Sequence, residues 1–569
     1  MLYSRTDGIA LRLSGQSNVN IKRTHRAIGS VSAMMLAPFA ALSVAADQGQ
    51  TSAAWKTQCT ALASTDLSTI EDAPSQVIEA KPVEARPDVP AHCQIEGYVT
   101  PNVGFSLMLS ASNWNGKFLE IGCGGDCGST GPTQQCNGPL RRGYACILFD
   151  AGHKGSGGLW AYNNLQTQID FGYRGAHVAA LAGKAITERY YTQAPKHSYF
   201  TGCSTGGRQA LVEAQRFPWD FDGIIAGAPW INDTASAMQY VWNDVVLSDK
   251  DGKSLLSHAD LQLVHDAALA KCDRDDGVKD RIIGNPLACR FDPATLVCKA
   301  GESSGCITQA QADAVKKVYA GPTNSKGEKI YTGGSPVGSE LDWASANLSN
   351  GNYWAIPYFR YEVIPAAGPS WQEKDFDFDR DDKRFAGGVQ ESLLNAANPD
   401  LRKFKAAGGR LLIYQGGKDA DVVPANTIDY YETLERTMGG HAATQDFARL
   451  FIIPGMGHCS GGEGAFAVDY LTHLEGWVEQ GKAPEMMIGA RVSDAYLAGA
   501  ALPSNLPWGS VEDMTPEMRV SVAAFFLEFP LDPAIPMDFT RPIYPYPLQA
   551  KYRGTGDANS AASFRPAAP

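Results

Sequence analysis

The sequence predicts an α/β protein with a parallel central sheet that is interrupted by a long insertion. Short apolar runs alternate with segments of helical character, which is typical of a parallel sheet covered by helices. Several of these runs end in glycine-rich or polar loops, where a parallel sheet carries its functional groups. Between residues 231 and 385 the composition becomes richer in Asn, Gly, Ser and Cys, and the apolar alternation weakens.

The order of the elements follows from these runs. Strands are expected at 117–121, 144–149, 199–201, 223–226, 410–414 and 450–453, and a helix is expected at 205–216. The first strand leads into a glycine-rich turn from Gly122 to Gly128. The core is therefore expected to be discontinuous, covering residues 46–230 and 386–569. Residues 231–385 are expected to form a lid domain.

The N-terminal segment has the composition of an export signal. Three basic residues between positions 22 and 26 precede an uncharged stretch that ends Ser43-Val44-Ala45-Ala46, a small-x-small cleavage pattern. A transmembrane anchor is the alternative, but Gly29 and Pro38 make the stretch too polar and broken for a good span. Residues 1–45 are thus predicted to be a signal peptide, and the protein is predicted to be secreted or periplasmic, with no membrane partner.

Charge and cysteine content narrow the class further. The chain has 61 acidic and 49 basic residues, without a Lys/Arg stripe, so nucleic acid is not an expected partner. Its 12 cysteines fit an oxidising compartment. The expected disulfides are Cys59–Cys93, Cys203–Cys459, Cys272–Cys289 and Cys298–Cys306. Cys123, Cys127, Cys136 and Cys146 remain unassigned, and their spacing fits a four-thiolate zinc site poorly.

Two segments about 250 residues apart predict nucleophilic catalysis. Gly202-Cys203-Ser204-Thr205-Gly206 matches the G-x-S-x-G nucleophile elbow, and His458 follows an apolar strand late in the chain. A serine hydroxyl needs a histidine base, and the histidine needs a carboxylate to orient it. Asp419 follows the strand that ends near Tyr414, which gives the order Ser, Asp, His of an α/β-hydrolase core. Asp421 is the rival acid, and Asp419 is preferred because it lies closer to the strand end.

An oxyanion hole needs two preorganised N–H donors. One is expected from Thr205, the residue after the nucleophile, and the other from Gly125 in the glycine-rich turn. A phosphate-binding loop is the alternative for that turn, but the Lys-Ser/Thr pair of a P-loop is missing.

The segment from Cys272 to Ile283 packs four aspartates into eight residues. The carboxylates of Asp273, Asp276 and Asp280, with the carbonyls of Val278 and Ile282, offer the oxygen ligands that Ca²⁺ prefers. The segment is not an EF-hand, because no Glu stands at its twelfth position. A solvated acidic loop is an equally good interpretation of the spacing alone.

These motifs together resemble the tannase and feruloyl esterase family, to which the mono-hydroxyethyl terephthalate hydrolases belong. The resemblance rests on five stretches: Gly202 to Gln209, Gly455 to Cys459, Phe376 to Asp381, Cys272 to Gly277 and Asn395 to Leu401. It implies an α/β-hydrolase core with a large inserted lid domain and a triad of Ser204, Asp419 and His458. It also implies a disulfide between the cysteines that flank the triad and a structural Ca²⁺ held by the aspartates of 273–280. Arg281 departs from the glycine that the family often has there.

The expected function is that of a secreted serine carboxylic-ester hydrolase acting on a small aromatic ester of feruloyl, galloyl or terephthaloyl type. A polyester depolymerase or a serine peptidase with the same triad is the enzymatic alternative. A non-enzymatic, calcium-stabilised binding protein is disfavoured because all three triad residues are present. Trp354, Phe359 and Arg360 lie in an aromatic run of the lid and are the expected substrate contacts.

Overall fold

The computed structural model describes residues 52–345, 355–363, 370–381, 383, 388–504, 506 and 511–569. Residues 49–569 form one compact unit. The predicted signal peptide, residues 1–45, lies outside the described residues. Within the described ranges, none of the helices combines the length and the hydropathy that crossing a membrane requires.

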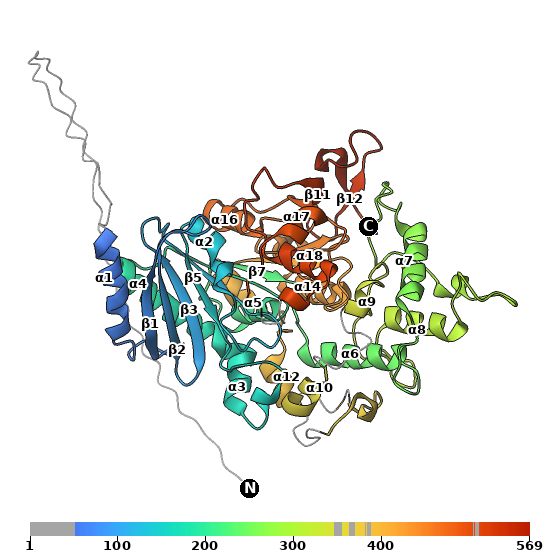
Figure 1. The fold of residues 1–569 in the computed structure, drawn as a ribbon, viewed down its shortest axis with the longest axis horizontal. Helices are drawn as coiled ribbons and strands as arrows, with labels where there is room; N and C mark the ends of the chain where they lie inside the picture. The colour runs from blue at the N-terminus through green and yellow to red at the C-terminus, as the bar shows by residue number, and fades with distance from the viewer. Residues whose placement is uncertain are drawn as a thin grey trace, which may run out of the picture. The chain divides into compact units, whose positions relative to one another are not determined.

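The unit is built on one nine-stranded sheet with the strand order β1-β2-β3-β5-β4-β6-β7-β8-β9 (Figure 1). Its strands are β1 Ser75–Val83, β2 His92–Val99, β3 Val103–Ser110, β4 Lys117–Ile121, β5 Ala145–Phe149, β6 His197–Cys203, β7 Gly223–Gly227, β8 Arg410–Gly416 and β9 Ala448–Ile453. The six strands from β5 to β9 in this order run parallel, as the sequence predicts.

Three antiparallel strands that the sequence analysis does not include extend the parallel sheet. β3 pairs antiparallel with β5, and β2 and β1 continue the meander to the edge. A register shift between Val77 and Glu79 marks a bulge in the edge strand β1. At the other edge, Phe451 of β9 forms a bridge with Pro545, and the Tyr546 N–H donates to the Leu450 carbonyl at 2.7 Å.

Helices cover both faces of the sheet, and successive strand residues face opposite sides, as the period of two in a strand requires. Phe118 packs in a core with helices α4 and α5, whereas its neighbour Leu119 packs in a second core with Leu474 of helix α16. The described α-helices are α1 Ser52–Ala61, α2 Asn137–Arg141, α3 Leu165–Ile169, α4 Gly175–Tyr191, α5 Thr205–Arg216, α6 Asp233–Leu247, α7 His258–Cys272, α8 Gln309–Ala320, α9 Asp342–Ser345, α10 Ala355–Pro357, α12 Val389–Leu394, α13 Arg402–Ala406, α14 Pro424–Met438, α15 His441–Gln445, α16 Tyr470–Gln480, α17 Asp494–Gly499 and α18 Pro516–Phe525.

Two short ribbons complete the C-terminal part. β10 Met487–Val492 pairs antiparallel with β11 Met537–Ile543, and β12 Gln549–Tyr552 pairs with β13 Phe564–Ala567. Both ribbons come after β9 in the chain. Each is a separate two-stranded sheet, and neither adds a strand to the main sheet.

The insertion between β7 and β8 is largely helical and has small cores of its own. α7 and α8 lie together, away from β1–β3 (Figure 1). Each begins with a capping box, built by Ser257 in α7 and by Thr308 in α8. Val264 and Val315 of these helices pack with Trp343 in one of these cores. The division into a core of 46–230 plus 386–569 and a lid of 231–385 remains a prediction.

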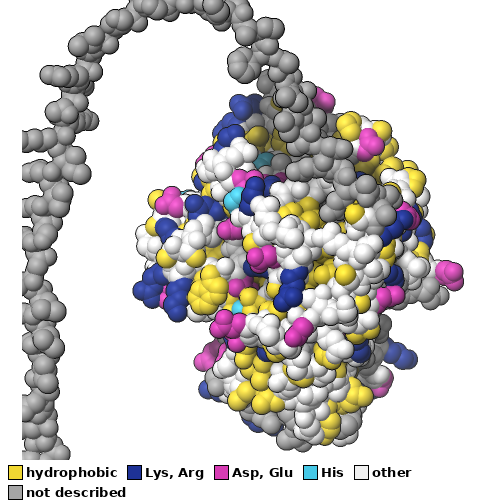
Figure 2. Space-filling model, turned by 90° about the vertical axis from the view of Figure 1, so that its left-hand side faces the viewer, with side chains coloured by type: hydrophobic (Ala, Val, Ile, Leu, Met, Phe, Trp, Pro, Cys, Tyr) yellow, Lys and Arg dark blue, Asp and Glu magenta, His cyan; other side chains and the backbone are white. Residues whose placement is uncertain are grey.

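Figure 2 shows one face of the molecule, on which basic and acidic side chains are interspersed. The full sequence carries a formal net charge of −12 at pH 7. A mixed surface of this kind gives this face no extended field of one sign.

Helix α5 lies so close to β7 that one of its positions accepts only glycine. A Cβ on Gly207 would lie 2.2 Å from the Gly227 carbonyl oxygen, whereas a Cβ on Gly476 of α16 would meet nothing within 4 Å. Gly207→Ala should therefore lower the free energy of unfolding by about 1–3 kcal/mol or prevent folding. The control Gly476→Ala should raise it by up to about 1 kcal/mol, because alanine favours a helix. Chemical denaturation of both variants measures the difference, and equal effects would contradict the close approach.

Candidate active site

Ser204 occupies a strained turn between β6 and α5. Its φ of 62° and ψ of −120° lie outside the regions that residues with a Cβ normally adopt. The Ser204 N–H donates to the Gly227 carbonyl at 3.0 Å, and the Ser204 carbonyl accepts from Trp230 N–H at 3.1 Å. A Cβ on Gly202 would lie 2.5 Å from the Gly206 backbone, so the turn needs its glycines. This geometry presents the serine at the carboxyl end of the sheet.

His458 and Asp419 lie after the two neighbouring strands β9 and β8. His458 Nδ1 lies 2.9 Å from Asp419 Oδ2, and the Asp419 side chain is fully buried. The other carboxylate oxygen, Oδ1, accepts the N–H groups of Asp421 and Val422 at 3.0 and 2.9 Å. The Gln415 amide donates to Oδ2 at 3.0 Å. Three donors therefore hold this carboxylate in one orientation toward the imidazole ring.

The rival acid Asp421 has a different partner. The Tyr240 hydroxyl donates to Asp421 Oδ1 at 3.1 Å. Burial raises the pKa of Asp421 to about 6; the His458 charge opposes this rise and the Asp419 charge adds to it. For His458, burial disfavours the protonated ring, but the charge and hydrogen bond of Asp419, with the charge of Asp421, raise its pKa to about 9. Asp419, rather than Asp421, contacts the ring nitrogen.

A disulfide joins the residues next to Ser204 and His458. Cys203 and Cys459 are bonded, with their Cα atoms 5.8 Å apart. Cys203 ends β6, and Cys459 adopts a left-handed conformation with a φ of 64° in the loop after β9. The bond spans a sequence separation of 256 residues, so it fixes two distant loops beside each other.

Every cysteine in the chain is bonded. The other three expected pairs, Cys59–Cys93, Cys272–Cys289 and Cys298–Cys306, are present. The four unassigned cysteines pair as Cys123–Cys127 and Cys136–Cys146. No free thiolate is left for zinc in this group, so the zinc alternative is wrong.

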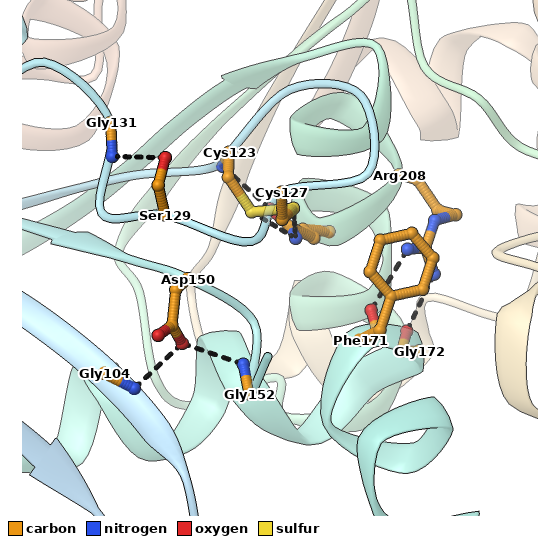
Figure 3. Close-up of a disulfide and its surroundings, with 11 residues drawn as sticks. Gly104, Cys123, Cys127, Ser129, Gly131, Asp150, Gly152, Phe171, Gly172 and Arg208 are labelled. Atoms are coloured by element: carbon orange, nitrogen blue, oxygen red, sulfur yellow. Dashed lines mark hydrogen bonds between the residues drawn. A yellow bond between two sulfur atoms is a disulfide. The ribbon is translucent and has the colours of Figure 1, made fainter. Parts of the chain in front are cut away.

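The glycine-rich loop after β4 is fastened to α5 through the Cys123–Cys127 disulfide (Figure 3). Gln209 of α5 accepts the Cys123 N–H at 3.2 Å, and its amide nitrogen lies 3.2 Å from the Cys123 sulfur. Thr205 and Gly125, the expected oxyanion donors, both line the same cavity as Ser204. The role of Gln209 was not predicted, and the only hint in the sequence is its place directly after the elbow.

Arg208 is a second residue that the sequence analysis did not assign. It is fully buried and donates to the carbonyls of Phe171, Gly172 and Leu394 at 2.9–3.1 Å. Its guanidinium lies 4.5 Å from the Phe171 ring centroid, and Figure 3 shows it beside Phe171 and Gly172. It therefore ties α5 to two segments that surround the site.

A cavity of about 730 Å³ opens at Ser204 and His458. Its described lining includes parts of the glycine-rich loop, α2, α6, residues 466–471 and α18 with the segment after it, together with Tyr358 and Glu362. The described lining thus comes both from the insertion and from C-terminal elements far beyond it.

The expected substrate contacts are not found in this lining. Trp354 lies outside the described residues. Phe359 does not line the described cavity, because its side chain is fully buried against Trp371 and Phe376, and its role in binding stays a prediction. Arg360 does not line the described cavity either, its Nε donates to the Trp371 carbonyl at 2.7 Å, and its contact with substrate stays a prediction. These side chains serve the packing of the insertion, and their neighbours Tyr358 and Glu362 face the cavity instead.

The acidic segment forms a compact loop after α7. Asp273 Oδ1 accepts the N–H groups of Asp280 and Arg281 at 3.1 and 2.8 Å. Burial, together with repulsion from Asp280 and Asp273, raises the pKa of Asp276 to about 6 despite a hydrogen bond from the Val278 N–H. The three carboxylates therefore lie close enough to repel one another.

Two further features shape this loop. Arg281 adopts a φ of 66°, in the left-handed region that favours glycine. Arg541 of β11 forms an ion pair with Asp280 at 2.6 Å, a contact that the sequence did not predict. One aspartate of the set thus already has a basic partner.

The fold and the site together define a class of protein. A parallel sheet that carries a strained serine after β6, an aspartate after β8 and a histidine after β9 is that of an α/β-hydrolase. The fold class predicted from the sequence is confirmed. The crystal structure of feruloyl esterase B from Aspergillus oryzae matches the chain with a TM-score of 0.75 at 25% identity, over 90% of this chain and 100% of that one.

The chain belongs to the tannase and feruloyl esterase family, whose model matches residues 88–567. A mono(2-hydroxyethyl) terephthalate hydrolase from Piscinibacter sakaiensis is 32% identical over 556 residues, covering 84% of this chain and 85% of that protein. A probable feruloyl esterase from Arthroderma benhamiae is 34% identical over 479 residues, covering 79% and 80%. The protein is thus a carboxylic ester hydrolase, as the sequence predicts.

The Cys203–Cys459 bond should hold the site together. Cys203→Ala/Cys459→Ala should lower the free energy of unfolding by about 2–5 kcal/mol and abolish most esterase activity, because the two loops lose their covalent link. The control Cys298→Ala/Cys306→Ala removes a disulfide with a sequence separation of only 8, whose residues do not line the cavity. It should retain activity. Denaturation curves and ester assays on both variants test this, and an equal loss of activity would refute the positional role.

Proposed function

We propose that this protein is a serine esterase that cleaves small aromatic esters through an acyl-enzyme on Ser204. The observation that carries the proposal is the 2.9 Å contact between His458 Nδ1 and Asp419 Oδ2. The disulfide between Cys459 and Cys203 links the loop of His458 to the strained turn of Ser204. The nucleophile Ser204 and the base His458 both line one cavity, and the orienting acid Asp419 is buried in contact with His458.

In the proposed reaction, His458 Nε2 takes the proton of the Ser204 hydroxyl while Oγ attacks the ester carbonyl carbon. The N–H groups of Thr205 and Gly125 receive the developing oxyanion. His458 then gives the proton to the leaving alcohol as the carbon–oxygen bond breaks. A water molecule, deprotonated by His458, attacks the acyl-enzyme and releases the acid, and Ser204 recovers its proton.

The proposal of an aromatic substrate rests on the walls of the cavity. The rings of Phe171, Trp230, Tyr240, Tyr358 and Phe466 line it, and planar groups pack well against such side chains. The relatives named as feruloyl esterase and as mono(2-hydroxyethyl) terephthalate hydrolase support the same substrate class. No residue that lines the described cavity favours a peptide chain or a polymer over a small ester, so we propose no second function.

The three catalytic assignments give separable expectations. Ser204→Ala should abolish hydrolysis of a chromogenic acetate ester. Asp419→Asn should lower kcat by about 10⁴-fold, because the ring loses its orienting carboxylate. Asp421→Asn keeps that contact, and kcat should stay within about tenfold of the wild type.

The pH profile distinguishes the two aspartates further. Protonated His458 cannot accept the serine proton, so kcat/KM should rise with pH through the pKa of His458, which lies above 6.5. Asp421→Asn removes a negative charge near the ring, lowers the pKa of His458 and should move this rise to lower pH. If Asp421→Asn instead costs more activity than Asp419→Asn, the acid is Asp421.

A structural Ca²⁺ in the acidic loop is the second part of the proposal. Asp273, Asp276 and Asp280 lie in one compact loop, where repulsion from the other two adds to the burial that raises the pKa of Asp276. A cation bound there would relieve this repulsion, and carboxylate oxygens are ligands that Ca²⁺ prefers. The carboxylates of Asp273, Asp276 and Asp280 and the carbonyls of Val278 and Ile282 would hold it. In that position Ca²⁺ would neutralise charge and rigidify the loop, and none of these residues lines the catalytic cavity.

Removal of Ca²⁺ should destabilise the protein without changing its chemistry. Chelation with EDTA should lower Tm by several degrees, and added Ca²⁺ should restore it. Asp276→Asn should abolish this response, whereas the exposed neighbour Asp275, changed to Asn, should leave it intact. Differential scanning calorimetry measures the shifts, and an EDTA-insensitive wild type would rule out the site.

Export of the protein from the cytoplasm is the third part of the proposal. It is supported by the six disulfides of the folded chain, because disulfides form and persist in oxidising compartments. The protein released from cells should begin near Ala46, after removal of the signal peptide. N-terminal sequencing of the released protein tests this, and an intact N-terminus on it would refute cleavage.

A further inference from the structure

A buried lysine, which the proposed reaction does not use, stands directly before Asp419 in the chain. Lys418 is only 5% exposed, and lysine is rarely this buried without an anionic partner. Its Nζ lies 2.6 Å from Glu463 Oε2 and 3.2 Å from Asp342 Oδ2. None of these three residues belongs to the described lining of the cavity. Their ion pairs therefore lie behind the catalytic groups and away from the substrate.

The lysine and its two partners come from three separate segments. Lys418 lies in the loop after β8, and Glu463 lies in the loop after β9, which also carries His458. Asp342 begins α9 in the insertion between β7 and β8. The Lys418 side chain thus joins the loop of the catalytic acid, the loop of the catalytic base and the insertion.

The loop of His458 turns back on itself, and Lys418 contacts it on both sides of the turn. Met456 forms a β-bridge with Gly462, so His458 lies between two paired limbs. The Lys418 N–H donates to the Met456 carbonyl at 3.1 Å, before the histidine. The Lys418 side chain binds Glu463, after the histidine. One residue therefore fixes the acid loop against both limbs of the histidine loop.

The electrostatics keep the lysine and Glu463 charged. Burial disfavours the ammonium group, but the charges of Asp342 and Glu463, with hydrogen bonds to both, raise the pKa of Lys418. Burial alone would raise the pKa of Glu463, but the charge and hydrogen bond of Lys418 lower it. Burial raises the pKa of Asp342 to about 6 although the charge of Lys418 opposes this, so Glu463 is the stronger of the two partners.

Stability alone is a poor reason for such an arrangement, because apolar residues in place of a buried ion pair often leave a protein as stable or more stable. What the ion pairs supply is a fixed geometry. The disulfide of Cys459 fixes the histidine loop to the serine turn, whereas Lys418 fixes the same loop to the acid loop. Both links are needed if His458 is to face Ser204 and Asp419 together.

We propose that Lys418 is a positioning residue, which holds the loops of Asp419 and His458 in register and ties them to the insertion through Asp342. The proposal rests on the esterase function above and adds to it a residue that touches neither substrate nor reacting atoms.

Lys418→Met tests the proposal, because it removes the charge and keeps most of the side-chain volume. With a chromogenic acetate ester, kcat should fall by about 10–100-fold, since a small misplacement of catalytic groups costs that much. KM should change by less than about threefold, because Lys418 lies outside the described cavity lining. The far-downfield proton NMR resonance of the hydrogen bond between His458 and Asp419 should weaken or shift.

Lys117→Met is the matched control. Lys117 also binds two carboxylates, those of Glu475 at 2.7 Å and Glu479 at 2.6 Å. It stands at the start of β4, whereas the triad follows the carboxyl ends of its strands, and it is not part of the described cavity lining. Lys117→Met should lower Tm by several degrees, as Lys418→Met should, because each leaves two carboxylates without their cation. Its kcat should stay within about twofold of the wild type, and the NMR resonance should not move.

Two milder variants separate the partners of the lysine. Glu463→Gln should lower kcat by about tenfold. Lys418→Met/Glu463→Gln should be within about threefold of Lys418→Met alone, because residues that act as one unit do not have additive effects. Asp342→Asn should lower kcat by only about threefold, in keeping with its longer contact.

The outcomes distinguish the positioning role from the underlying function. A wild-type kcat in Lys418→Met, or an equal loss of kcat in Lys117→Met, overturns the role of Lys418 and leaves the esterase proposal standing. If Lys418→Met does not fold, Glu463→Gln decides by the same measures, and a wild-type kcat there overturns the role. An unchanged kcat in Asp342→Asn removes the insertion from the proposal. A wild-type protein that does not cleave the acetate ester overturns both proposals.

Discussion

The covalent bond between Cys203 and Cys459 is the constraint on which the site depends. A serine turn and a histidine loop that are far apart in sequence gain a fixed separation through it. The hydrogen bonds to Asp419 then orient the histidine, and the close fit of α5 against β7 holds the serine turn. The neighbouring glycine-rich loop is held by Gln209 in the same helix. One helix and one disulfide thus position the nucleophile, the base and the oxyanion loop.

Local patterns predicted the parts of the fold that local physics decides. The glycines of the elbow, the apolar run of β4 and the extent of α5 all follow from short-range steric and periodic rules. Strands β1–β3 were not predicted, because their antiparallel pairing beyond β5 depends on contacts between residues that are distant in the sequence. The pairing of Cys123 with Cys127 was open for the same reason, since several partners were equally near in the sequence.

The residues around the substrate were the hardest to predict. Phe359 and Glu362 lie within one short helical segment, yet one is buried in packing and the other faces the cavity. Only the direction of each side chain decides which is which, and composition carries no information on that. The functions of Arg208 and Gln209 likewise depend on which loops lie beside α5. The triad was predictable because its chemistry restricts both residue type and chain order.

The two edges of the nine-stranded sheet are protected against pairing with another chain. Edge strand β1 carries a bulge between Val77 and Glu79, an exposed Lys81 and the proline at position 82, which has no N–H to offer. The opposite edge, β9, is covered by the segment around Pro545. A large sheet with open edges invites aggregation through the addition of a strand from another chain. One edge of this sheet is blunted by the residues of its own strand, and the other is covered by a later segment of the chain.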